Sequence, residues 1–175
     1  MPSHSRRCLL LSSLLPLVSS LVLAQVSDVI RDASLAGLTG FSVSVGELSA
    51  QVQAEGLTAD QLRDDIGLKL RAAAIGTVPE SAWIDSAGSA ELYLEANTLK
   101  YGGTQYSFSL QLNVIQKVLL PSKEGRQTLA ATWSATVMGV AGARSVAGTI
   151  RGQAGTQVDR FIIGYRSANP LKEKR

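Results

Sequence analysis

Apolar and polar side chains alternate along most of residues 90–140, and this pattern limits the possible folds more than any other feature of the chain. Successive side chains of a strand point to opposite faces of a sheet, so alternation with period two predicts strands with one buried face. The paired glycines Gly102 and Gly103 supply the backbone angles of a tight hairpin. We therefore predict an antiparallel meander of three strands, at residues 90–100, 105–120 and 127–140.

Two further features complete the predicted sheet. Phe41, Val43 and Val45 alternate with serines, which predicts another strand at residues 40–46. The alternation of the middle meander strand is interrupted at Val114 and Ile115, which predicts a β-bulge there.

Helical periodicity appears in two segments. Residues 57–75 begin with Thr58 and Gln61, which have the spacing of a capping box, and continue with apolar residues at intervals of three and four. Residues 143–168 repeat apolar side chains in the same way and stop before Pro170. This second helix contains three glycines, whose clustering predicts a close approach of its backbone to the sheet or to a partner helix: Gly148, Gly152 and Gly155.

The predicted order is β-α-β-β-β-α. Two amphipathic helices can cover one face of a sheet, so we expect a two-layer α+β domain with a four-stranded, mostly antiparallel sheet and two helices on one face. If the first two strands are parallel in the same sheet, the crossover through the first helix should be right-handed. In a chain of 175 residues this leaves an N-terminal arm at 25–39, a single domain at 40–170 and a basic flexible tail at 171–175.

The first 24 residues have the parts of a secretory signal peptide. Arg6 and Arg7 precede an apolar run, and the run ends in a small-residue cleavage site at Ala24. An uncleaved membrane anchor is the alternative, although Pro16 and several serines interrupt the run. We predict cleavage after Ala24, a periplasmic or secreted protein, and no integral membrane span in the mature chain.

Cleavage would also remove His4 and Cys8, which are the only histidine and cysteine of the chain. Their loss excludes thiol nucleophiles, the usual Cys/His zinc sites, haem ligation by His or Cys, and Ser-His catalysis. Lys plus Arg falls from 17 to 15 against 14 acidic residues, without a cationic cluster suited to phosphates. We expect no catalytic residues, no cofactor, no metal and no nucleic-acid partner.

Several runs resemble a group of uncharacterised small exported bacterial α+β proteins with no known activity. The resemblance is carried by residues 56–62, the hairpin at Gly102 and Gly103, the Ala-Thr-Trp-Ser run at 131–134, and the ending from Val158 to Pro170. It implies bacterial export and assigns a role to no residue.

The second face of the predicted sheet is polar but nearly neutral. A solvated sheet face commonly carries more Lys and Glu, whereas hydroxyl and amide side chains suit a protein partner, a glycan or a self-interface. An ordinary hydrated face of a protein with few charges is the alternative. The candidate partner-binding residues are Tyr93, Asn97, Ser107, Ser109, Gln111, Asn113, Thr132 and Ser134.

These observations favour a non-enzymatic binding or assembly module of the bacterial cell envelope, acting through this face or through a strand edge. The partner would be an envelope protein or a second copy of the chain. A carrier of lipids or small molecules is one alternative, with a cavity lined by Trp83, Trp133 and Phe161. A carboxylate-dependent hydrolase is another, although Glu91 and Glu95 would lie about 13 Å apart along one strand, too far for a glycosidase pair.

Overall fold

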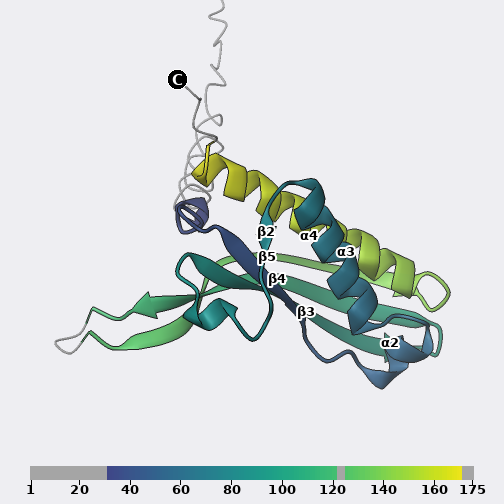
Figure 1. Cartoon of the computed structure of the whole chain (residues 1–175). Coiled ribbons are helices and arrows are strands. Elements are labelled where there is room, and N and C mark those ends of the chain that lie inside the picture. The colour runs from purple at the N-terminus through teal and green to yellow at the C-terminus, as the bar shows by residue number, and fades with distance from the viewer. Residues whose placement is uncertain (1–30, 122–124, 171–175) are drawn as a thin grey trace, which may run out of the picture.

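The computed structural model describes residues 31–121 and 125–170, which form a mixed five-stranded sheet with helices packed on one face (Figure 1). The strands are β1 (Gly40–Val45), β2 (Gly76–Thr77), β3 (Ser89–Tyr101), β4 (Gln105–Leu119) and β5 (Gln127–Gly142). The helices are α2 (Ala50–Ala54), α3 (Ala59–Ala72) and α4 (Val146–Ala168), with a short 3-10 helix, η1 (Trp83–Asp85). The α+β class is confirmed. The predicted leader, the start of the arm and the basic tail lie outside the described residues.

The sheet order is β2-β1-β3-β4-β5. β1 pairs in parallel with β2 and with β3, while β3, β4 and β5 form the predicted antiparallel meander. The prediction of four strands is wrong because β2 has only two residues, too few to show a period. Gly76 makes this edge possible, since a Cβ there would lie 2.6 Å from the carbonyl oxygen of Thr39.

The helix α3 begins with the predicted capping box, in which Thr58 and Gln61 exchange hydrogen bonds with each other's backbone N–H groups. Its buried face includes Leu62, Ile66 and Leu70, as the periodicity predicts. α2 was not predicted, because a helix of five residues has too few turns to reveal a face. Ser49 caps it by accepting a hydrogen bond from the backbone of Val52.

The main core lies between the sheet and the two long helices. Phe161 of α4 packs edge-to-face on Phe41 of β1 and on Trp133 of β5, with ring centroids 5.0 and 5.6 Å apart. Tyr165 adds a third edge-to-face contact with Phe41. The indole Nε1 of Trp133 donates a hydrogen bond of 2.9 Å to Asp32, which ties the N-terminal segment to this layer.

The expected role of the glycines in α4 is wrong for two of the three. A Cβ at Gly148 or Gly152 would meet no atom within 4 Å, so these glycines lie on the solvent-exposed side of the helix. Gly155 approaches the side chain of Lys69 instead of the sheet. The close approach occurs at Gly164, where a Cβ would lie 2.9 Å from a carboxylate oxygen of Asp32.

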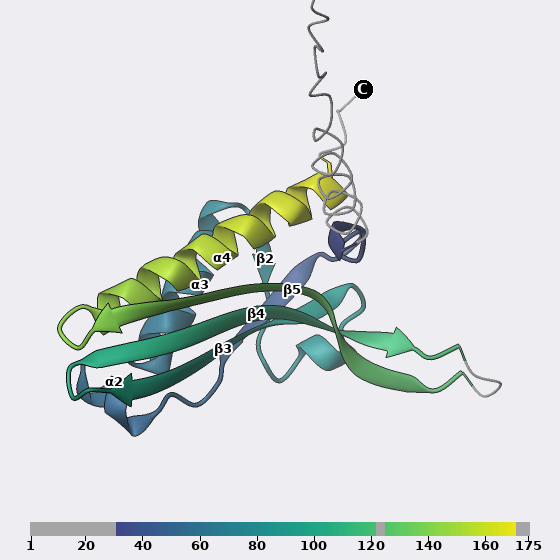
Figure 2. The same ribbon diagram turned by 180° about the vertical axis from the view of Figure 1, so that it is seen from behind.

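The predicted bulge lies where the alternation of β4 breaks. Val114 pairs with Trp133 and Ile115 pairs with Ala131, so Thr132 is the extra residue, on β5. The pairing of β3 with β4 ends at Ile115. Beyond this point β4 and β5 continue as two strands that project from the body (Figures 1 and 2). We call residues 116–119 and 127–130 the projecting ribbon.

Candidate binding surface

The face of the sheet turned away from α3 and α4, here called the open face, carries most of the predicted binding residues. Strand register aligns them in rows across β3, β4 and β5. Successive rows are Tyr93–Asn113–Ser134, Glu95–Gln111–Thr136, Asn97–Ser109–Met138 and Leu99–Ser107–Val140. All of the predicted residues except Thr132 therefore share one face.

Thr132 does not lie on the open face, and its prediction as a binding residue is corrected. The bulge removes it from the alternation, because it occupies the unpaired position of β5. Its hydroxyl accepts a hydrogen bond of 2.6 Å from the amide of Gln116, and its carbonyl accepts one from Ser34. Thr132 holds the N-terminal segment against the sheet.

The part of the open face near β1 is closed. Ser42 is fully buried and Asn113 is 7% exposed. The 3-10 helix η1 contacts β1 and β3, and Figure 1 shows it on the side of the sheet opposite the helices. Trp83 of η1 is buried as well, so this loop covers the β1 side of the face, while Ser134 and Thr136 of β5 remain exposed.

The accessible part of the open face ends in an apolar area. We call Asn97, Leu99, Ser107, Ser109, Met138 and Val140 the open-face patch. Leu99, Met138 and Val140 are 65%, 78% and 69% exposed. A hollow of about 350 Å³ lies over the patch. The patch is uncharged and combines large apolar side chains with serine hydroxyls.

The sequence prediction missed the three apolar members of the patch. Met138 and Val140 have the same parity as Ser134 and Thr136, and this signal extends the face to the end of β5. This alternation signal was obscured because the intervening positions at the end of β5, which face the helices, are also apolar, as at Val137 and Ala141. Alternation cannot identify the buried face where both faces carry apolar side chains.

The acidic side chains of the open face do not form a catalytic pair. Glu91 accepts a hydrogen bond of 2.5 Å from Ser44, and Glu95 accepts one of 3.1 Å from Asn97. Both glutamates belong to β3, four residues apart, which corresponds to about 13 Å. This separation exceeds the range for either stereochemical class of glycosidase.

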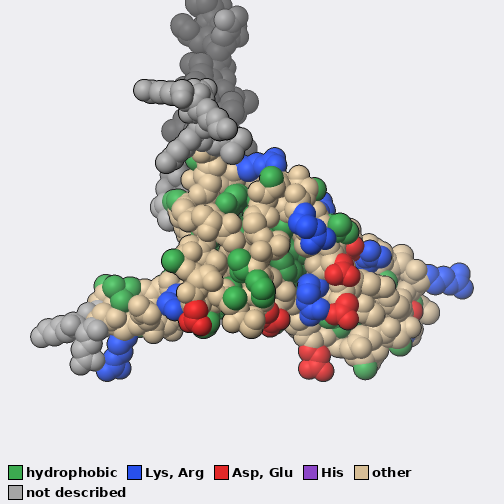
Figure 3. Space-filling model, viewed as in Figure 1, with side chains coloured by type: hydrophobic (Ala, Val, Ile, Leu, Met, Phe, Trp, Pro, Cys, Tyr) green, Lys and Arg blue, Asp and Glu red, His purple; other side chains and the backbone are tan. Residues whose placement is uncertain are grey.

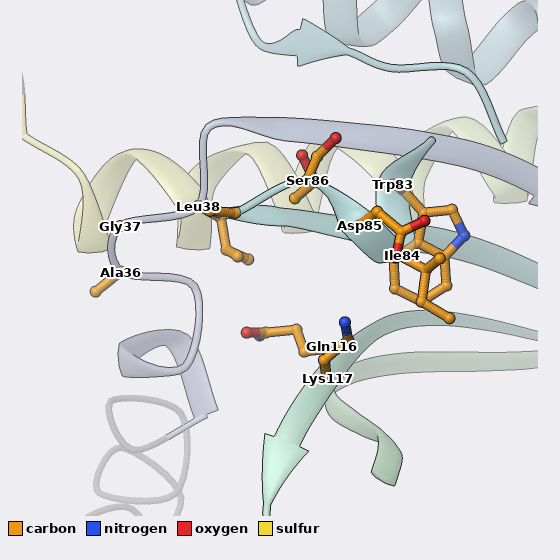
Figure 4. Close-up of a pocket in the computed structure, with 12 residues that line it drawn as sticks. Ala36, Gly37, Leu38, Trp83, Ile84, Asp85, Ser86, Gln116 and Lys117 are labelled. Carbon is orange, nitrogen blue, oxygen red and sulfur yellow. The ribbon is translucent and has the colours of Figure 1, made fainter. Parts of the chain in front are cut away.

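Two hollows on other parts of the surface are lined by carboxylates. One, of about 450 Å³, lies between the N-terminal segment, η1 and β4, and Asp85 is the acidic residue among its lining side chains (Figure 4). Another, of about 300 Å³, is lined by both Asp64 and Glu80 together with Arg63 and Arg71. Asp64 and Glu80 are exposed to solvent, unlike the shielded acid of a glycosidase.

A cluster at the hairpin end contains titratable groups that hydrogen-bond one another. Lys100 Nζ and Tyr106 OH both donate to the same oxygen of Glu55, at 3.1 and 3.0 Å. These hydrogen bonds, first that of Lys100, hold the pKa of Glu55 below its ordinary value. The hydrogen bond to Glu55 raises the pKa of Lys100. The cluster joins the end of α2 to β3 and β4.

The aromatic residues proposed for a carrier cavity do not line one space. Trp133 and Phe161 belong to the buried cluster between sheet and helices, with their rings in direct contact. Trp83 lies outside that cluster and borders the hollow beside η1. The structure thus separates the three side chains that the carrier hypothesis requires together.

The described part of the chain, residues 31–121 and 125–170, contains no group of three or more His, Cys, Asp or Glu residues placed to hold a metal ion. None of its helices combines the length and apolar character needed to cross a bilayer.

No family model matches the chain, and no curated protein matches it. Among solved structures, a PelC dodecamer from Paraburkholderia phytofirmans is 18% identical, with a TM-score of 0.44, and the match covers 74% of this chain and 90% of that one. A minor lipoprotein from Acinetobacter baumannii is 8% identical, with a TM-score of 0.27, and covers 74% of this chain and 92% of its own. Similarities at this level assign neither a family nor a function.

Proposed function

We propose that the chain is an exported, non-enzymatic binding or assembly module of the bacterial cell envelope, and that it binds its partner through the open-face patch. The observation that carries the proposal is the exposure of Leu99 on β3 and of Met138 and Val140 on β5, which flank Ser107 and Ser109 of β4 on one uncharged surface. Export is supported by the predicted leader, and the lack of catalysis by the absence of histidine and cysteine beyond residue 8.

The physical basis is the cost of leaving this surface in water. Burying one Leu, Met or Val side chain is worth roughly 1.5–3 kcal/mol, so three on one surface provide a substantial driving force for association. The serines around them offer hydrogen bonds that a partner can use without desolvating a charge. A soluble surface that has no partner ordinarily interrupts such an area with Lys or Glu.

The outer edge of β5 is a second accessible element beside the patch. β5 is the last strand of the sheet order, and none of its residues from Gln127 to Gly142 is charged or a proline. Such an edge can accept another strand. A partner that binds the patch can therefore extend its contact to this edge.

Site-specific crosslinking tests the proposal. A photo-crosslinking amino acid at position 138, in cells that export the chain, should give a discrete crosslinked product. The same amino acid at position 163 is the matched control, because Ile163 is 70% exposed on α4, away from the patch. The product from position 138 should disappear when Ser109→Lys is added, since a buried lysine opposes binding.

A contrary result is equally clear. Products from position 163 without any from position 138 would show that the chain binds through its helical side. A product at position 138 that Ser109→Lys leaves unchanged would also contradict the assignment of the patch. Thermal unfolding of each variant confirms that the domain remains folded.

A further inference from the structure

We infer that the partner of the open-face patch is the projecting ribbon of a second copy of the chain, so that copies associate head to tail. The inference rests on the proposed function, because it takes the patch as the binding surface. It adds the identity of the occupant, which follows from the ribbon itself.

The ribbon exposes apolar side chains without structural support. Lys117 pairs with Leu129, and Leu119 lies two residues further along β4, so all three side chains share one side of the ribbon. Leu119 and Leu129 are 66% and 46% exposed. No third strand pairs with this part of β4 and β5 among the described residues. Figure 3 shows hydrophobic and basic side chains on this projection.

A two-stranded ribbon alone is only marginally stable in water. This one extends from the body with leucines exposed, whereas the remaining length of β4 is supported by β3. Burial of Leu119 and Leu129 against another surface would supply the missing support. A surface of matching character exists elsewhere on the same chain, in the open-face patch.

The charges of the two surfaces are complementary. In the rows of the open face that cross β3, β4 and β5, the charged residues are Glu91 and Glu95. Glu95 is two residues from Asn97 of the patch, just as Lys117 is two residues from Leu119. In the described part of the chain Lys117 forms no ion pair. Apolar side chains can thus meet apolar ones while Lys117 approaches Glu95.

The ribbon cannot cover the patch of its own chain. Leu119 and Ser109 are ten residues apart in one extended strand, which corresponds to about 33 Å. The two surfaces therefore meet only between copies, and each copy offers one of each kind. Such heterologous contacts produce a closed ring or an open chain of subunits.

Complementation between two variants tests the inference. Sedimentation velocity of the exported full chain should show association beyond a dimer that increases with concentration. Leu119→Glu damages the ribbon and Met138→Lys damages the patch, and each should weaken association by about tenfold or more, as expected for a lost apolar contact. An equimolar mixture should form heterodimers and nothing larger, because the intact ribbon of the Met138→Lys variant meets the intact patch of the Leu119→Glu variant while the two remaining surfaces are both damaged. Ile163→Lys, at a similarly exposed site on α4, should behave as wild type.

Other outcomes overturn the inference in distinguishable ways. A wild-type chain that stays monomeric at all concentrations excludes self-association, and crosslinking from position 138 then decides whether the patch still binds another protein. Association lost with Met138→Lys but kept with both Leu119→Glu and Leu129→Glu would exclude the ribbon as the occupant. Binding of a monomeric chain to phosphatidylglycerol vesicles that Leu119→Glu abolishes would assign the ribbon to lipid. Circular dichroism establishes that each variant is folded.

Discussion

Gly139 of β5 and Gly148 of α4 have completely different surroundings. A Cβ at Gly139 would lie 2.6 Å from the ring of Phe108, which packs across β5 at this point and is itself nearly buried. A Cβ at Gly148 would meet no atom within 4 Å, because this glycine lies on the solvent-exposed side of α4. One glycine is needed for packing, and the other only weakens a helix.

Alanine at each position should therefore change stability in opposite directions. We expect Gly139→Ala to lower the free energy of unfolding by about 1–3 kcal/mol, because the Phe108 ring must move in a packed layer. Gly148→Ala should raise it by about 1 kcal/mol, the difference in helix propensity between the two residues. Urea denaturation of both variants measures this, and a destabilised Gly148→Ala would show that the outer side of α4 is covered.

At the scale of elements, the short helix α2 depends on a charged contact with the hairpin of β3 and β4. Glu55 ends α2 and accepts hydrogen bonds from Lys100 and Tyr106, while Tyr106 also donates to the carbonyl of Gln51. The ammonium group of Lys100 lies 5.1 Å from the centre of the Tyr106 ring. A helix of five residues has little stability of its own, so these contacts position it.

The pKa shifts in this cluster predict how stability depends on pH. The pKa of Glu55 is lowered in the folded chain, so its stabilising contribution is complete above its unfolded pKa. It is lost as pH falls from that value through the folded pKa. Glu55→Gln should therefore reduce stability near neutral pH and flatten its decline as pH falls below about 4.5.

Denaturant unfolding across this pH range measures the effect. Asp60→Asn is the control, since the ion pair of Asp60 with Arg63 lies within α3 and leaves α2 untouched. A decline for Glu55→Gln as steep as that of wild type would show that other carboxylates govern acid unfolding. Asp65, whose pKa is lowered mainly by its hydrogen bond with Arg151, is then the first to consider.

The elements that could be predicted are those long enough to repeat a pattern. Strands β3 to β5 show alternation over many residues, and α3 has both a capping box and an apolar face. β2 and α2 exist because of tertiary contacts at Gly76 and Glu55, which leave no periodic signal. The polar residues of the open face could be predicted because they follow the alternation of β3 to β5. The orientation of Thr132 could not, because it depends on the geometry of a bulge, which alternation does not specify.

At the scale of the whole molecule, helices cover one face of the sheet and leave the other partly bare. α3 and α4 are joined by Arg151 with Asp65 and by Lys69 with Asp159, which fixes them as one layer. On the opposite side η1 covers only the β1 end. The resulting asymmetry places an apolar patch at one end of β4 and an apolar ribbon at its other end.

This asymmetry makes the route of the chain through the cell important, because exposed apolar surfaces at both ends favour premature association. A cleaved leader would deliver the domain to the compartment where association is useful. We predict that the exported chain begins at Gln25 and has lost His4 and Cys8, and intact mass measurement of the periplasmic or secreted protein tests this. Leu14→Arg, which interrupts the apolar run, should leave the chain uncleaved inside the cell, whereas Leu14→Val should be processed normally. An exported protein that retains residues 1–24 would contradict the prediction and restore a histidine and a cysteine to the working molecule.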